Sequence, residues 1–201
     1  MKIKNHTGLP IALILMLCLF CYRCKKTDAT VKNSPQMPKT FASDPASGFV
    51  HPGIVNTKET LDYIAQQANS GDANRLAAYQ YVLNYCNNHS PSGQYKATVN
   101  VAGGVTTPDE IAFQGDALLS YTLALRWAKT GTASYATTVK QILDGWASHF
   151  QNFSVSGSNP NQAYLEASWA APTFVAAAEI IKYYVPVNGV AAGWTTSENN
   201  Q

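Results

Sequence analysis

The sequence predicts an all-α fold built from antiparallel helical hairpins, and two observations carry this prediction. Residues 107–150 contain two long apolar segments that are separated only by a short turn around Gly131. From residue 49 onward, apolar residues recur at helical spacing, and no segment alternates convincingly between apolar and polar residues. These patterns indicate five helices and no strand.

The central pair of helices has well-defined ends. Thr107 is a suitable N-cap, Pro108 is tolerated in a first turn, and Gly131 can adopt the left-handed conformation that ends a helix. The first helix has almost no polar face, which predicts that it is enclosed on several sides. The second helix starts at Thr132 or Ser134 and carries one apolar stripe of helical period: Tyr135, Val139, Ile142, Leu143, Trp146 and Phe150.

Two helices are predicted before this pair. Asn56 begins the first of them with a capping box that Glu59 completes. A break at Gly71 follows, because glycine accepts backbone conformations that end a helix. Asp72 then caps the second helix, which we expect to end near Cys86.

One helix is predicted after the central pair. Pro172 suits its first turn, and Pro186 stops it. Two polar segments, residues 87–106 and 152–162, show no periodic pattern and are expected to be irregular loops. Long loops within a compact domain often line a functional site.

The first residues are expected to direct export. Lys2 and Lys4 precede an apolar segment at residues 11–20, which is shorter than the roughly 18 residues that a membrane-spanning helix needs. This pattern predicts a signal peptide over residues 1–24, with an uncleaved anchor as the alternative. Cys24 is followed by two lysines and resembles the lipidated cysteine of bacterial lipoproteins. We therefore expect an exported protein, located in the periplasm or attached to the outer membrane through an N-terminal lipid.

Composition separates a linker from a folded domain. Residues 25–48 are polar and contain proline, which predicts a flexible linker, and the domain occupies residues 49–201. The domain has seven basic and ten acidic side chains, a net charge of −3. This balance excludes a nucleic-acid partner, which needs a clustered basic surface. A net negative charge also disfavours the binding of a polyanion. Cys86 is the only cysteine of the domain, so no disulfide forms within it.

Dispersed positions of the domain resemble the alginate lyase domain of bacterial polysaccharide lyases. The resemblance covers most of residues 49–194 and rests on His51-Pro52-Gly53, Asp116, Leu125-Arg126-Trp127, Gly131, Ile142-Leu143 with Trp146, Leu165, and Ala178-Glu179. It implies an (α/α) toroid that cleaves uronate-containing polysaccharide, such as alginate, by β-elimination outside the cytoplasm. It also implies an anionic polysaccharide as partner and no cofactor or obligatory metal.

β-Elimination defines the residue types that such an enzyme needs. Donors must neutralise the substrate carboxylate as charge develops, and a His or Tyr must remove the neighbouring proton. The resemblance implies an Asn/His/Tyr/Arg set that lies largely on helices following the segment seen here. Thr195 and Glu198 form a capping-box pattern close to Gln201, which indicates the front part of a longer protein, with a frayed C-terminal tail as the alternative. We expect residues 1–201 alone to show no eliminative cleavage.

One short segment resembles the catalytic signature of the family, Asn-Asn-His-Ser-Tyr-Trp. It is Asn87-Asn88-His89-Ser90, followed by Pro91 and Ser92 in place of Tyr and Trp. The segment precedes the central helix pair, whereas the family places its signature after that pair. We interpret it as a loop at a helix end that approaches substrate, and Asn88 and His89 are the candidates for a direct catalytic role.

Four residues are candidates for substrate binding. Gln114 could reach sugar hydroxyls, and Tyr164 and Trp169 could stack on sugar rings beside a loop. Asp116 is a carboxylate on a nearly apolar helix, so it either holds a loop by hydrogen bonds or points into a cleft.

Two other classes of function stay open at this point. The first is a non-catalytic glycan-binding surface lipoprotein on the same helical scaffold. The second is an interaction module of the tetratricopeptide type, although the sequence has no fixed short repeat.

Overall fold

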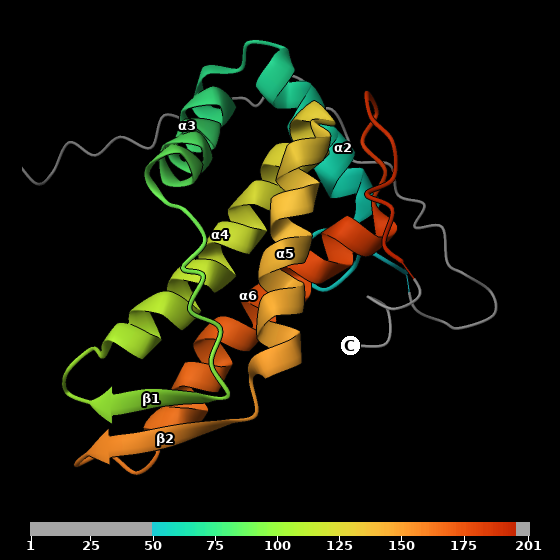
Figure 1. Cartoon of the computed structure of the whole chain (residues 1–201). Helices are drawn as coiled ribbons and strands as arrows, with labels where there is room; N and C mark the ends of the chain where they lie inside the picture. The colour runs from blue at the N-terminus through green and yellow to red at the C-terminus, as the bar shows by residue number, and fades with distance from the viewer. Residues whose placement is uncertain (1–49, 196–201) are drawn as a thin grey trace, which may run out of the picture. The chain divides into compact units, whose positions relative to one another are not determined.

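Helices dominate the part of the chain that the computed structural model describes, residues 50–195 (Figure 1). The elements in chain order are α2 (Lys58–Asn69), α3 (Ala73–Asn88), β1 (Thr98–Gly103), α4 (Pro108–Thr130), α5 (Ala133–His149), β2 (Asn152–Gly157) and α6 (Gln162–Tyr183). Five helices in this range confirm the predicted number. The predicted signal peptide over residues 1–24, with Cys24, the linker over residues 25–48 and Glu198 all lie outside the described residues.

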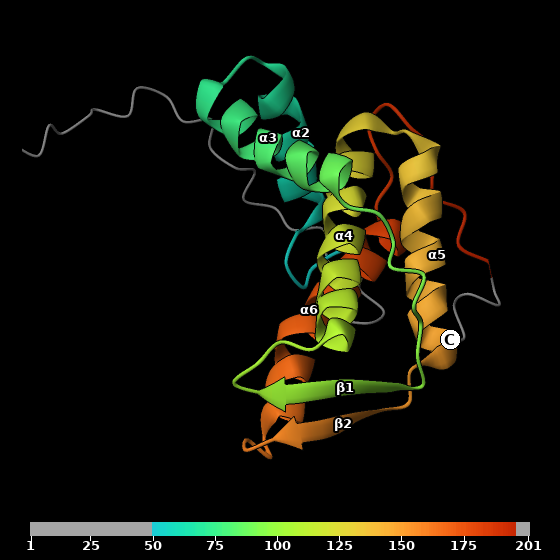
Figure 2. The same ribbon diagram turned by 60° about the vertical axis from the view of Figure 1, so that its left-hand side comes forward.

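The α4–α5 hairpin has the ends that the sequence predicts (Figures 1 and 2). The Thr107 hydroxyl accepts a hydrogen bond from the Glu110 N–H at 3.1 Å, and the Glu110 carboxylate accepts one from the Thr107 N–H at 2.6 Å. This reciprocal pair is a capping box. Gly131 ends α4 in the left-handed region, with a φ of 69°, and its N–H donates to the Trp127 carbonyl.

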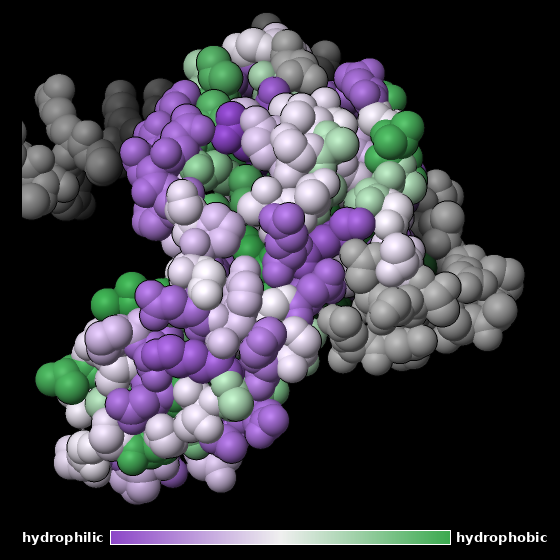
Figure 3. Space-filling model, in the orientation of Figure 1, coloured by the Kyte–Doolittle hydropathy of each residue, from purple (hydrophilic) through white to green (hydrophobic). Residues whose placement is uncertain are grey.

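The core surrounds α4, which packs against α2, α3, α5, α6 and β1. The prediction that this helix is enclosed on several sides is confirmed, because its buried residues do not keep to one face. The largest apolar side chains of the core are almost fully buried: Leu119, Trp127, Val139, Ile142, Ile180, Ile181 and Tyr184. The face seen in Figure 3 is largely hydrophilic, with apolar side chains in small separate groups. No helix within residues 50–195 is long and apolar enough to cross a membrane.

The prediction of no strand is wrong. β1 and β2 form a two-stranded parallel sheet in which Thr98 pairs with Asn152 and Gly103 pairs with Gly157. The α4–α5 hairpin connects the two strands. The error in β1 comes from its length: Val99 and Val101 alternate with polar residues, but this pattern covers only part of a six-residue strand that ends in Ala102 and Gly103. The hydrogen bonds of each strand come from a segment more than fifty residues away, so neither strand is evident from its local pattern.

Two predicted helix starts also differ from the structure. Thr57, rather than Asn56, is the N-cap of α2, and its hydroxyl accepts from the Thr60 N–H at 3.2 Å. The Asn56 amide instead donates to the Tyr121 hydroxyl at 2.7 Å. α6 begins ten residues earlier than expected, so that Pro172 lies inside it. The apolar face that α6 packs against α4 outweighs the local cost of that proline.

The first described residues are tied to the end of α6. The Glu179 carboxylate accepts hydrogen bonds from the Gly53 and Ile54 N–H groups at 3.0 and 2.8 Å, and it lies 2.7 Å from His51 Nδ1. The His51 ring stacks on Tyr183. Burial alone would raise the pKa of Glu179, but the two N–H donors and His51 bring it below its ordinary value. His51 therefore anchors the start of the domain.

The packing at Gly131 gives a first prediction. A Cβ on Gly131 would lie 2.7 Å from the Asn188 carbonyl oxygen and 2.9 Å from the Gly189 Cα. Gly71 also has a positive φ, but no atom lies within 4 Å of the position of its Cβ. We expect Gly71→Ala to lose about 1–2 kcal/mol of unfolding free energy through backbone strain. Gly131→Ala should lose a further 1–3 kcal/mol, roughly, from the steric contact. Urea unfolding of both variants measures the difference, and equal losses would contradict the close approach.

Candidate functional site

One buried carboxylate holds the loop between α3 and β1 against α4. Asp116 is 2% exposed, and its Oδ1 accepts from the Ser92 N–H at 2.8 Å. Its Oδ2 accepts from the Ser92 hydroxyl at 2.6 Å and from the Trp146 indole N–H at 2.8 Å. These donors compensate for the burial of the charge. The contacts of Asp116 are thus those of a group that holds a loop.

The same loop is fixed against α5 by Tyr95. The Tyr95 ring lies so close to Gly145 that a Cβ at this glycine would collide with it. The ring also meets Trp146 edge to face, with 5.6 Å between ring centroids. Asp116 and Tyr95 together give a segment without regular structure a defined position.

The anchored loop encloses a cavity of about 370 Å³ at the end of α3. His89, Ser90, Ser92 and Gln94 line it from the loop side. Pro108, Ile111, Ala112, Gly115 and Asp116 line it from α4. We call this cavity the His89 pocket. It brings together two of the predicted site residues, His89 and Asp116.

The orientation of His89 leaves one ring nitrogen suited to accept a proton. Its Nδ1 lies 2.9 Å from the Tyr85 carbonyl oxygen. Because a carbonyl only accepts, Nδ1 carries the proton, and Nε2 of the neutral ring is the acceptor. The imidazole stacks on the Tyr85 ring at a centroid distance of 3.8 Å. Burial, followed by the negative charge of Asp116, raises the pKa of Tyr85. The pair combines a candidate base with a tyrosine that keeps its proton.

Asn88 does not line the His89 pocket. Its amide donates to the Asn84 carbonyl at 2.9 Å, back onto its own helix. The preceding Asn87 accepts from the Arg126 guanidinium at 3.0 Å. Of the four residues Asn87-Asn88-His89-Ser90 that resemble the catalytic signature, His89 and Ser90 therefore line the pocket.

Gln114 contacts a second buried carboxylate, on α6. Its amide donates to Glu166 Oε2 at 2.7 Å, while Glu166 Oε1 has no hydrogen-bond partner among the described residues. Glu166 is 0% exposed. Burial raises its pKa, the Gln114 hydrogen bond opposes this rise, and the negative charge of Glu110 adds to it. The net effect is that the pKa of Glu166 is raised above its ordinary value.

The two aromatic candidates lie on the solvent side of α6. Tyr164 is 76% exposed and Trp169 is 55% exposed. Leu165, between them, is also exposed. Neither aromatic ring lines the His89 pocket. The structure thus leaves both rings accessible to a ligand, on a surface separate from that cavity.

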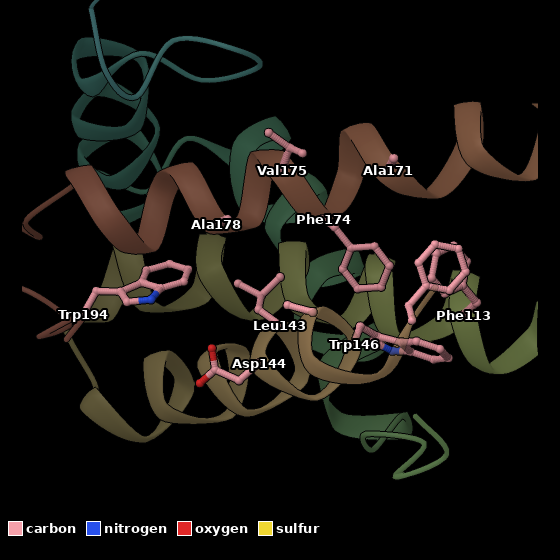
Figure 4. Close-up of a pocket in the computed structure, with 11 residues that line it drawn as sticks. Phe113, Leu143, Asp144, Trp146, Ala171, Phe174, Val175, Ala178 and Trp194 are labelled. Carbon is pink, nitrogen blue, oxygen red and sulfur yellow. The ribbon is translucent and has the colours of Figure 1, made fainter. Parts of the chain in front are cut away.

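A larger, apolar groove of about 520 Å³ lies between α5 and α6 (Figure 4). Phe174 of α6 points toward Leu143 and Trp146 of α5 across it, and Trp194 lies at one end. The groove offers aromatic surface but few polar groups.

The residue types around these sites determine which chemical roles the sites can play. No cluster of three or more His, Cys, Asp or Glu side chains that could hold a metal ion occurs within residues 50–195. The His89 pocket offers a base and hydroxyl groups, but none of the residues that line it is Arg or Lys. Sequence reasoning missed Tyr85, although its separation of four residues from His89 on one helix was a usable signal.

The three hydrogen bonds of Asp116 predict a strong effect on stability. Asp116→Asn replaces one acceptor oxygen with an NH₂ group that faces donors, so we expect a loss of about 2–4 kcal/mol in unfolding free energy. Ser92→Ala removes the hydroxyl that donates to Asp116 and accepts from the Gln94 N–H at 3.2 Å, but it keeps the Ser92 N–H bond, and it should cost about 1–2 kcal/mol. Urea unfolding measures both, and limited proteolysis of the loop reports its release. Equal stability of Asp116→Asn and wild type would refute the anchoring role.

The raised pKa of Glu166 predicts that the difference in stability between wild type and Glu166→Gln depends on pH. Its pKa in the folded protein is raised above the ordinary value of 4.5. The raised pKa therefore contributes fully to the stability of the fold below pH 4.5, where the folded and the unfolded protein both hold the proton. This contribution is lost as the pH rises through the raised pKa. Glu166→Gln cannot ionise, so its melting temperature should equal that of wild type at low pH and exceed it increasingly toward neutral pH. A constant difference across the pH range would contradict the raised pKa.

Comparisons with known proteins do not assign this site. No family model, no curated protein and no solved structure matches the chain. The function therefore has to be argued from the residues and their geometry.

Proposed function

We propose that the chain is part of a polysaccharide lyase of the alginate-lyase type. Its paired helices would form an incomplete (α/α) toroid that acts on uronate-containing polysaccharide by β-elimination. One observation supports this proposal: residues that carry the resemblance in the sequence contact one another in space.

Three pairs of such residues illustrate the point. Asp116 accepts a hydrogen bond from Trp146, the Gly131 N–H donates to the Trp127 carbonyl, and Glu179 binds the segment that contains His51. In each pair, both residues belong to the dispersed positions that carry the resemblance. In the pairs Asp116–Trp146 and Glu179–His51 the two side chains satisfy each other, whereas the Gly131–Trp127 bond is a backbone contact at the end of one helix.

The His89 pocket supplies part of the chemistry for elimination. His89 Nε2 has the character of a base. Tyr85 stacks on the His89 ring but does not line the pocket, and its hydroxyl donates to the Gly115 carbonyl at 3.5 Å. The substrate carboxylate also needs a cationic or amide donor as its α-proton leaves. Gln94 is the only amide that lines the pocket, and no cation does. Elimination therefore requires donors beyond those that line this pocket.

A second candidate function is glycan binding without catalysis. Tyr164 and Trp169 favour it, because exposed aromatic rings provide the flat apolar surface on which sugar rings stack. In either case we propose an exported protein that is attached to the periplasmic side or the outer membrane through lipidated Cys24.

Two assays on the full chain separate these functions. Affinity electrophoresis in gels that contain alginate measures binding, and ultraviolet absorbance of the unsaturated uronate measures elimination. We expect retardation by alginate and no rise in absorbance. Trp169→Ala and Tyr164→Ala should each weaken binding by about three- to tenfold. Tyr81→Ala is the matched control, since Tyr81 is 78% exposed on α3.

The other outcomes are equally informative. A rise in absorbance that His89→Gln abolishes would assign catalysis to the His89 pocket. Equal retardation of all three aromatic variants would reject the stacking surface. No retardation and no absorbance change with any polyuronate would reject the carbohydrate proposal.

A further inference from the structure

A third cavity, of about 290 Å³, lies where α2, α3 and α4 meet. These three helices pack against one another, and Figure 2 shows α2 and α3 beside the end of α4 that leads to α5. Its volume is close to the lower limit of small-molecule sites, and that limit suits a ligand of one ring. No function considered above uses this cavity.

Two cationic side chains line it. Arg75 comes from α3 and Lys129 from the last turn of α4. The Arg75 guanidinium donates to the Tyr63 hydroxyl at 3.2 Å, and Lys129 Nζ lies 4.6 Å from the centroid of the Tyr79 ring. Tyr63 is a neutral partner, so the charge of Arg75 is not cancelled by this contact. The cavity thus carries positive charge from two separate helices.

No carboxylate lines the same cavity. The acidic side chains of α2 are Glu59 and Asp62, and neither belongs to its wall. Asp62 is engaged by Lys58 at 2.6 Å and by the Tyr184 hydroxyl at 2.7 Å. Of the acidic residues in α4, all lie in the half of the helix away from Lys129. Asp72 Oδ1 accepts from the Arg75 N–H at 2.9 Å, but Asp72 does not line the cavity either. The charged side chains of the cavity wall are therefore cationic, which favours an anion.

The remaining wall combines an apolar surface with one polar pair. Leu61, Val82 and Leu125 provide apolar contacts. Asn56 donates to Tyr121 at 2.7 Å, and both side chains line the cavity. A ligand with an apolar ring face, hydroxyl groups and one carboxylate matches all three features of the wall.

We propose that this cavity binds a single uronate sugar, with its carboxylate directed toward Arg75 and Lys129. The pyranose ring lies against the apolar wall, and its hydroxyl groups reach Asn56 and Tyr121. This inference rests on the proposed function, because it names the subsite that recognises the charge of the polymer.

NMR titration of the full chain with D-glucuronate tests the proposal. We expect saturable shifts in residues of α2, α3 and α4 around the cavity. Neutral D-glucose and acetate each lack one of the recognised features and should bind at least tenfold more weakly, roughly, if at all. Arg75→Gln and Lys129→Gln should each weaken glucuronate binding by about tenfold, the loss of one charge-assisted hydrogen bond. Arg75→Lys should retain most of the affinity.

Lys182→Gln is the matched control. Lys182 also lies in the last turn of a helix, α6, and its Nζ lies 5.3 Å from the centroid of the Tyr183 ring. It is absent from the cavity wall. Its substitution removes the same favourable charge at a helix end and should leave glucuronate binding unchanged. Equal weakening by Lys129→Gln and Lys182→Gln would overturn the site, as would equal binding of glucose, equal binding of acetate, or no saturable shift.

These outcomes separate the cavity from the proposed function. Binding of glucuronate without any binding of alginate would support the cavity and reject the polysaccharide proposal. Retardation by alginate that the double variant Arg75→Gln/Lys129→Gln leaves intact would support the polysaccharide proposal and overturn this subsite. Dispersed NMR spectra of the variants establish that they are folded.

Discussion

A buried carboxylate must be surrounded by donors, and this requirement organises the irregular parts of the fold. Glu110 holds the turn before α4 through the Thr107 and Ala102 N–H groups. Asp116 holds the loop after α3 through Ser92, and Glu179 holds the first described residues through Gly53 and Ile54. In each case a carboxylate of α4 or α6 binds backbone N–H groups outside the helices, and for Glu110 one of these groups, that of Ala102, lies in β1. Three loops are thereby fixed to the two helices at the centre of the core.

Glu166 does not follow this pattern, because its hydrogen-bond partner is a side chain rather than backbone N–H groups. Among the described residues its hydrogen-bond partner is the Gln114 amide, which donates to one carboxylate oxygen, and the other oxygen has no partner. A charged carboxylate would be unfavourable there, and a neutral one is tolerated, which is why its pKa is raised while that of Glu179 is lowered. Two buried carboxylates therefore have pKa values shifted in opposite directions, because Glu179 accepts backbone N–H donors and Glu166 does not.

The sequence predicted what is decided locally and missed what is decided by distant contacts. The caps of α4 at Thr107 and Gly131 depend on residues within one turn, and both were predicted correctly. The strands, by contrast, acquire their hydrogen bonds only from each other, and α6 continues through Pro172 because α4 packs along it. At the candidate site, His89 was a candidate only because its segment resembles the catalytic signature of the family, and its role stays a prediction. The cavity that unites Arg75 with Lys129 could not be, since it exists only where three helices meet.

The burial and pairing of carboxylates also affect how the net charge of the domain should be interpreted. A balance of −3 from residue 49 onward seems unsuited to a polyanion. However, four of the ten acidic side chains are buried: Glu110, Asp116, Glu166 and Glu179. Two more are paired with lysines, Asp62 with Lys58 and Asp109 with Lys96. A saccharide that approaches the surface first meets exposed groups, and at the junction of α2, α3 and α4 the groups that line the cavity are cationic or neutral. Local arrangement, rather than the total count, decides which charge a ligand encounters.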